Sequence, residues 1–153
     1  MTAVSRDRTS AGPVVGELTK PPTWVEAEAH LAAAAYLLHR SGDSALVVTA
    51  DRAGDAIALL GATDISRAVA EGRDLESTRV RQVVPGPPQR VQADLPVREA
   101  ARAMLSHGVV QLVVCSGDRV LGIADLADVC RALLASGDAA VPARRPAAGP
   151  PAP

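Results

Sequence analysis

The feature that most constrains this chain is an internal repeat. Residues 25–48 align without a gap on residues 91–114, at an offset of 66 residues. The identical pairs are Val25 and Val91, Ala27 and Ala93, Ala34 and Ala100, Ala35 and Ala101, Gly42 and Gly108, Leu46 and Leu112, Val47 and Val113, and Val48 and Val114. A repeat of this kind indicates two copies of one supersecondary unit. Because one copy of about 60 residues buries little surface alone, we expect the copies to pack together.

The repeat continues beyond this segment. Asp64 aligns on Asp128 and Arg67 on Arg131 at an offset of 64, so the connecting loop of the first copy is two residues longer. Hydrophobic periodicity predicts strand, helix, strand, strand and helix in each copy. Thr63 or Asp64 is expected to cap the last helix of the first copy. The predicted elements are strands 23–25, 45–49 and 56–60 with helices 28–40 and 65–71, then strands 90–93, 110–115 and 120–124 with helices 96–106 and 126–135.

This pattern predicts an α/β (α+β) fold with two related halves. The first copy spans residues 14–72 and the second spans 80–136, joined by a charged linker at 73–79. Residues 1–13 are polar, and residues 137–153 are rich in Pro and Ala. Such compositions bury little apolar surface, so we expect both ends of the chain to be disordered.

Composition excludes several classes of function. The net charge of −1 offers no basic surface for phosphate backbones, and one Trp and one Tyr offer few stacking platforms for single strands. The longest apolar run, Leu31–Leu38, is too short to span a membrane. The polar start carries no secretory signal. We therefore expect no nucleic-acid partner, no membrane and a cytoplasmic location.

The two cysteines and three histidines indicate little metal or redox chemistry. Cys115 and Cys130 do not form a disulfide framework, and both are expected in the core. No His has a metal-ligand spacing to Cys or to carboxylates, so no metal site is predicted. Nor does the sequence offer a nucleophile–base pair or a Gly-rich phosphate loop, so we do not expect an enzyme. High Ala, Arg, Gly and Pro content indicates a GC-rich bacterial source.

Three short motifs carry a family resemblance. They are GDSALVV at 42–48 with GVVQLVV at 108–114, GIADLADV at 122–129, and VGELT at 15–19. In this order and in duplicate, over residues 14–136, they resemble the tandem cystathionine-β-synthase (CBS) domain pair, or Bateman module. The resemblance implies two pseudo-twofold-related halves packed through their sheets, with two clefts between them. It also implies binding of adenine nucleotides or related adenosyl compounds, and a homodimer formed through the helices.

The resemblance places an aspartate of each copy, Asp64 and Asp128, on the ribose hydroxyls of a ligand. A carboxylate can accept hydrogen bonds from both hydroxyls. Where the family has a hydroxyl residue, this chain has Gly61 and Asp125. Helix capping remains an alternative role for both aspartates. The candidate ligand-binding residues are Asp64, Thr63, Arg67, Gln89, Arg90 and Gln111 in one cleft, and Asp128, Thr23 and Ser44 in the other.

We expect the Asp64 cleft to be the better site, because Asp43 and Asp125 add negative charge beside Asp128. The predicted function is a regulatory module that binds AMP, ADP, ATP or another adenosyl ligand and signals through a protein effector. No cofactor is certain. The alternative is a dimeric interaction scaffold of the same fold that has lost its ligand.

Overall fold

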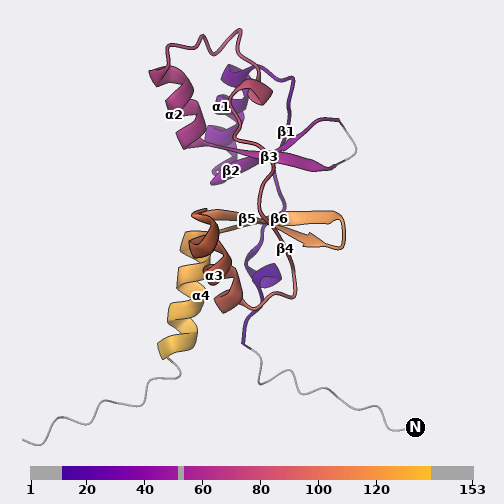
Figure 1. Cartoon of the computed structure of the whole chain (residues 1–153), viewed down its shortest axis with the longest axis vertical. Coiled ribbons are helices and arrows are strands. Elements are labelled where there is room, and N and C mark those ends of the chain that lie inside the picture. The colour runs from indigo at the N-terminus through magenta and orange to yellow at the C-terminus, as the bar shows by residue number, and fades with distance from the viewer. Residues whose placement is uncertain (1–11, 52–53, 139–153) are drawn as a thin grey trace, which may run out of the picture.

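Two three-stranded sheets, one from each copy of the repeat, form the centre of the molecule (Figure 1). The computed structural model describes residues 12–51 and 54–138. The first copy contains η2 (Val15–Leu18), β1 (Trp24–Glu26), α1 (Leu31–Ser41), β2 (Ala45–Thr49), β3 (Ala56–Gly61) and α2 (Ala62–Ala70). The second contains η3 (Val80–Gln82), β4 (Arg90–Gln92), α3 (Val97–His107), β5 (Gln111–Ser116), β6 (Arg119–Asp125) and α4 (Leu126–Asp138).

The two sheets have the same topology and register. In each, a short strand runs parallel to the central strand, which pairs antiparallel with the third. Trp24 lies opposite Val47, and Arg90 lies opposite Val113, so both pairs are related by the sequence offset of 66. The predicted equivalence of the two inner strands is confirmed.

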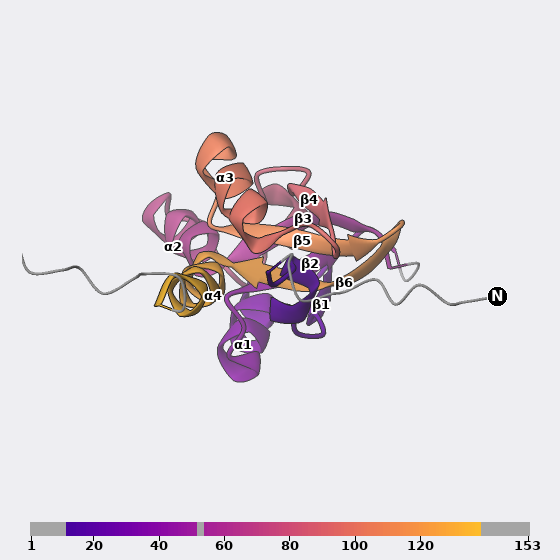
Figure 2. The same cartoon turned by 90° about the horizontal axis from the view of Figure 1, so that it is seen from below.

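Each sheet is covered on both faces. One face packs against the helices of its own half, and the other packs against the second sheet through Val47, Ala56, Val113, Cys115 and Val120. All five residues of β2 are buried, because a strand covered on both faces has no solvated side. Figures 1 and 2 show the helices gathered toward one side of the molecule and the two hairpins extending toward the other.

Helix boundaries follow the sequence with small shifts. Gly42 and Gly108 end α1 and α3 with φ of 69° and 63°, in the left-handed region that Gly adopts without strain. Helix α2 begins at Ala62 rather than at residue 65, so Gly61 is its N-cap and the prediction of Thr63 or Asp64 was wrong. Helix α4 runs to Asp138, three residues beyond its predicted end. The rest of the two predicted tails, at 1–11 and 139–153, lies outside the described residues.

The first segment of each copy packs on the other half. In η2, Val15 is fully buried in the core of the second half, and its N–H donates to the Leu95 carbonyl at 2.8 Å. In η3, Val80 is fully buried in the core of the first half, and its N–H donates to the Ala29 carbonyl at 3.0 Å. The indigo turn in the lower half of Figure 1 is η2. This exchange carries residues 19–23 and 83–89 past the junction between the halves.

The two cysteines differ in their surroundings. Cys115 is buried between the sheets, as predicted. Cys130 is exposed, so its expected place in the core was wrong. The neighbouring Val129 takes the inward position on α4, and a helix turns the next residue away from that face. Within the described residues, no helix is long and apolar enough to cross a membrane.

Candidate ligand clefts between the halves

The larger cleft lies where β3 runs into α2. One wall is the junction around Gly61 and Asp64 in the first half, and the others are residues 85–89 and 108–111 of the second half. Its volume is about 580 Å³. The predicted residues that line it are Thr63, Asp64, Gln89 and Gln111. These residues come from both halves, as the family resemblance implies.

Asp64 is held in place by two hydrogen bonds. Its Oδ2 accepts the backbone N–H of Gly61 at 3.0 Å, across the start of α2. Its Oδ1 accepts Nη2 of Arg67, one turn along the helix, at 2.6 Å. The side chain is 15% exposed. Since each carboxylate oxygen has two lone pairs, each can accept one further bond, which suits a pair of adjacent hydroxyls.

Gln89 and Gln111 are anchored by different contacts on the opposite wall. The Gln111 side-chain amide crosses between the halves and donates to the Ser44 carbonyl at 3.0 Å. The Gln89 carbonyl accepts the N–H of Val113 at 2.9 Å, which fixes that backbone beside β5. Amide side chains both donate and accept, so this wall can recognise the polar edge of a base.

Two predicted residues, Arg67 and Arg90, do not line the cleft. Arg67 is held by Asp64 and reaches the Val83 carbonyl at 3.4 Å. Nη2 of Arg90 donates to Oδ1 of Asp55 at 2.7 Å and to the Ala56 carbonyl. The hydrogen bond to Asp55 raises the pKa of the Arg90 guanidinium above its usual value. Arg90 therefore joins the two halves on the hairpin side.

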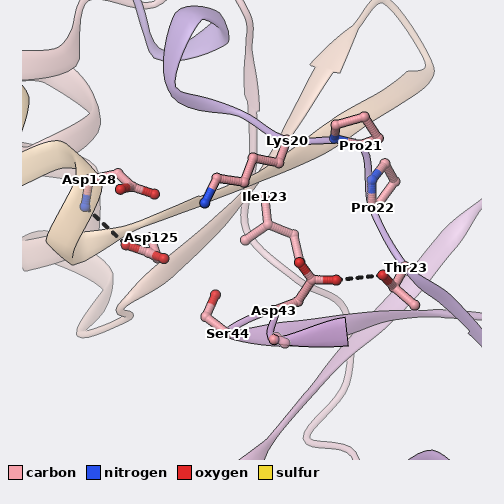
Figure 3. Close-up of a pocket in the computed structure, with 11 residues that line it drawn as sticks. Lys20, Pro21, Pro22, Thr23, Asp43, Ser44, Ile123, Asp125 and Asp128 are labelled. Carbon is pink, nitrogen blue, oxygen red and sulfur yellow. Dashed lines mark hydrogen bonds between the residues drawn. The ribbon is translucent and has the colours of Figure 1, made fainter. Parts of the chain in front are cut away.

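The smaller cleft is on the Asp128 side, with a volume of about 60 Å³. Figure 3 shows its polar groups: Thr23 donates to Asp43, and Asp125 accepts the backbone N–H of Asp128 at 3.0 Å. The carboxylate of Asp128 also pairs with Arg131 at 2.6 Å. The predicted residues that line this cleft are Thr23, Ser44 and Asp128, and Ser44 lines the larger cleft as well.

Sequence reasoning missed Lys20. This residue lines the smaller cleft, and Figure 3 shows its side chain extending toward Asp125 and Asp128. The available signal was its place directly before Pro21 and Pro22, at the end of the segment that leads into β1. Lys20 places one positive charge among the carboxylates of Asp43, Asp125 and Asp128.

Two sequence differences accompany the unequal size of the clefts. Lys20 forms a bridge with Ile123 of β6, and a Cβ on Gly122 would lie only 2.0 Å from the Lys20 carbonyl oxygen. The first half has Ala58 at the position of Gly122. The segment that leads into β1, residues 19–23, therefore lies close against β6 on the Asp128 side. The corresponding segment that leads into β4, residues 83–89, is two residues longer.

Metal binding has no support in the part of the chain that the structure describes. There, no three His, Cys, Asp or Glu side chains are grouped so that they could hold an ion. In the smaller cleft, the ammonium group of Lys20 accompanies the carboxylates of Asp43, Asp125 and Asp128.

Known structures share this fold. A CBS domain protein from Pyrobaculum aerophilum, PAE2072, complexed with AMP, is 27% identical with a TM-score of 0.72, over 82% of this chain and 98% of that one. The CBS domain pair of protein MJ0100, in complex with 5′-methylthioadenosine and S-adenosyl-L-methionine, is 22% identical with a TM-score of 0.71, over 82% and 97%. The CBS-domain protein ATU1752 from Agrobacterium tumefaciens is 25% identical with a TM-score of 0.69, over 78% and 98%.

The family itself is shown by sequence. No curated protein matches the chain. The CBS domain matches it twice, at residues 15–71 and 80–135, which together cover most of its length. The two matches coincide with the two copies of the repeat. The chain therefore belongs to the CBS domain family, as a tandem CBS pair.

Proposed function

We propose that this chain is a regulatory sensor that binds an adenosyl ligand, such as an adenine nucleotide, in the Asp64 cleft. One observation carries the proposal: the Asp64 carboxylate, with acceptor capacity to spare, lines a cleft of about 580 Å³ built from both halves. Small-molecule sites commonly have volumes of about 300–1,000 Å³. The cleft therefore has room for a whole nucleoside.

Each polar group of the cleft has a proposed role. Asp64 accepts hydrogen bonds from the two ribose hydroxyls, and the hydroxyl of Thr63 supports it. Gln89 and Gln111 hydrogen-bond the edge of the base from the opposite wall. The AMP complex of PAE2072, which is 27% identical to this chain, supports an adenosyl ligand as the class.

The Asp128 cleft is proposed as the weaker site. Thr23, Ser44 and Asp128 could bind a ligand there, but the volume of about 60 Å³ is far below that of a nucleoside site. Two further carboxylates, Asp43 and Asp125, line the same space. A ligand at this cleft would have to displace the Lys20 segment first.

The proposed output is a change in the arrangement of the two halves within one chain. This change would also alter how two copies of the chain pack in a dimer. A ligand that contacts both walls stabilises the arrangement of halves that it binds best. We also propose a homodimer through the helices, because Leu105 and Leu134 are 80% and 68% exposed on α3 and α4. A protein effector would then respond to the dimer. No catalytic step belongs to this proposal.

The second candidate is a scaffold of the same fold without a ligand. It is favoured by the loss of the hydroxyl residue from both motifs, since Gly61 and Asp125 occupy those places. Under that reading, Asp64 serves only to cap α2 through the N–H of Gly61. The two candidates differ in whether any adenosyl compound binds.

Isothermal titration with adenosine, AMP and ATP separates them. We expect one ligand per chain, lost in Asp64→Ala and retained in Asp128→Ala, because, of the two clefts, only the Asp64 cleft has room for a nucleoside. Asp128→Ala is the matched control, since the two aspartates are equivalent in the repeat. Thermal unfolding without ligand shows that both variants fold. If no compound binds the wild-type chain, the scaffold function replaces the sensor. If Asp128→Ala alone removes binding, the site has been assigned to the wrong cleft.

A further inference from the structure

We infer that the Asp64 cleft selects an adenosyl ligand whose 5′ substituent is uncharged, and disfavours nucleoside di- and triphosphates. The inference rests on the proposed function and specifies its ligand class. It comes from the charges on the cleft wall. Among the described residues that line this cleft there is no Lys, Arg or His, and Asp64 is the one charged side chain.

The nearby arginines do not change this balance. Arg67 lies outside the lining, and its charge is already paired with Asp64 at 2.6 Å. Arg90 follows the lining residue Gln89 in sequence, yet it is paired with Asp55 at 2.7 Å on the hairpin side. To reach a phosphate, either arginine would have to leave a carboxylate without its partner.

The N-terminus of α2 adds little attraction for a phosphate group. Backbone N–H groups at a helix N-terminus attract anions. Here the third residue of the helix, Asp64, places its own carboxylate at that end and accepts the N–H of Gly61. Arg67 pairs with this carboxylate from outside the lining, so a triphosphate in the cleft would face the negative member of the pair. Like charges at close range repel each other even in water.

The rest of the wall suits an uncharged group. The residues from Pro85 to Pro88 and the pair Val109 and Val110 give the cleft an apolar surface beside its amides. A hydroxyl or alkyl substituent on the ribose 5′ carbon can rest on such a surface at a small desolvation cost. A polyphosphate in the same place would lose the strong hydration of its charges.

Titration calorimetry without divalent cations tests the inference. Adenosine is expected to bind at least about tenfold more tightly than ATP at low salt, with AMP between them. Raising the salt from about 20 mM to about 500 mM should strengthen ATP binding and leave adenosine unchanged, because salt screens the repulsion. Tighter binding of ATP, weakened by salt, would overturn the inference while leaving the sensor intact. Absence of binding by all three compounds would overturn both.

A variant of the wall gives a second test. Val110 is 57% exposed, so Val110→Lys adds a positive charge with little effect on packing, and Val110→Gln is the neutral control. Val110→Lys should bind ATP about fivefold more tightly than Val110→Gln, and its ATP affinity should fall with salt. Equal ATP affinities in the two variants would show that wall charge does not set the selectivity, and would overturn the inference.

Discussion

At the scale of single residues, Gly122 and Ala58 occupy equivalent positions and differ by one methyl group. Gly122 lets the backbone of Lys20 cross β6 at a distance that no Cβ would allow. Ala58 is buried at the corresponding position of the first half. A glycine is thus required on the strand that Lys20 crosses, and the equivalent strand of the other half carries a side chain.

The substitution Gly122→Ala should therefore destabilise the protein. The added Cβ forces the Lys20 backbone away from β6, and overpacking of this kind costs about 1–3 kcal/mol. The free energy of unfolding, measured in urea, reports the change. Gly137→Ala in α4 is the control, because nothing lies within 4 Å of a Cβ added there. Equal stabilities for the two variants would show that the Lys20 segment does not close on β6.

At the scale of elements, the repeat predicted most of the order and register. Strand β2 has the predicted bounds, and the inner strands are equivalent as expected. The exchange of η2 and η3 between the halves was not predicted, because periodicity shows that a segment is apolar and does not show which core it enters. The prediction that Cys130 is buried was wrong for a similar reason, because each step of one residue along a helix turns the side chain by about 100°.

The candidate site was predictable where it depended on the repeat. Asp64 of the first copy meets Gln89 and Gln111 of the second copy, because the cleft lies between the two copies. Arg90 was predicted at the same wall, and its side chain turns instead to Asp55. The sequence carries no signal for that choice, because the pairing partner lies on the other half.

The packing of η2 and η3 on the opposite halves has a specific consequence for local stability. Val15→Ala removes two methyl groups from the second core and should cost roughly 1–3 kcal/mol. Hydrogen exchange should then speed up in β5 and β6 more than in β2 and β3, because Val15 is buried in the second half. Val80→Ala is the matched variant and should show the opposite pattern. Faster hydrogen exchange in β2 and β3 for Val15→Ala, and in β5 and β6 for Val80→Ala, would contradict the packing of η2 and η3 on the opposite halves.

At the scale of the whole molecule, three helices expose large apolar side chains. Leu105 and Leu134 are large apolar side chains with 80% and 68% exposure, and Tyr36 on α1 adds a third at 66%. Large apolar groups on several helices of one molecule are typical of a surface that meets another protein. Figure 2 shows α3 and α1 at opposite edges of the molecule, with α4 to the left between them.

We expect the chain to sediment as a dimer at tens of micromolar. Leu105→Glu together with Leu134→Glu should convert it to a monomer, since charges at the core of an interface oppose association. Ser116→Glu, an exposed position at the end of β5, adds one glutamate away from the helices and should leave the dimer intact. A wild-type monomer at that concentration would contradict the proposed assembly. A double variant that stayed dimeric would place the interface on another face.

The measurement that most directly tests the account is an NMR titration of the ¹⁵N-labelled chain with adenosine. Binding in the Asp64 cleft should shift the amide signals of Gly61, Asp64, Gln89 and Gln111 together, with one saturation curve, because these residues line one space. The amide signals of Thr23, Asp43 and Asp125, which line the other cleft, should move little. Saturable shifts confined to Thr23, Asp43 and Asp125, or no saturable shift at any of these amides, would contradict the assignment of the Asp64 cleft as the adenosyl site.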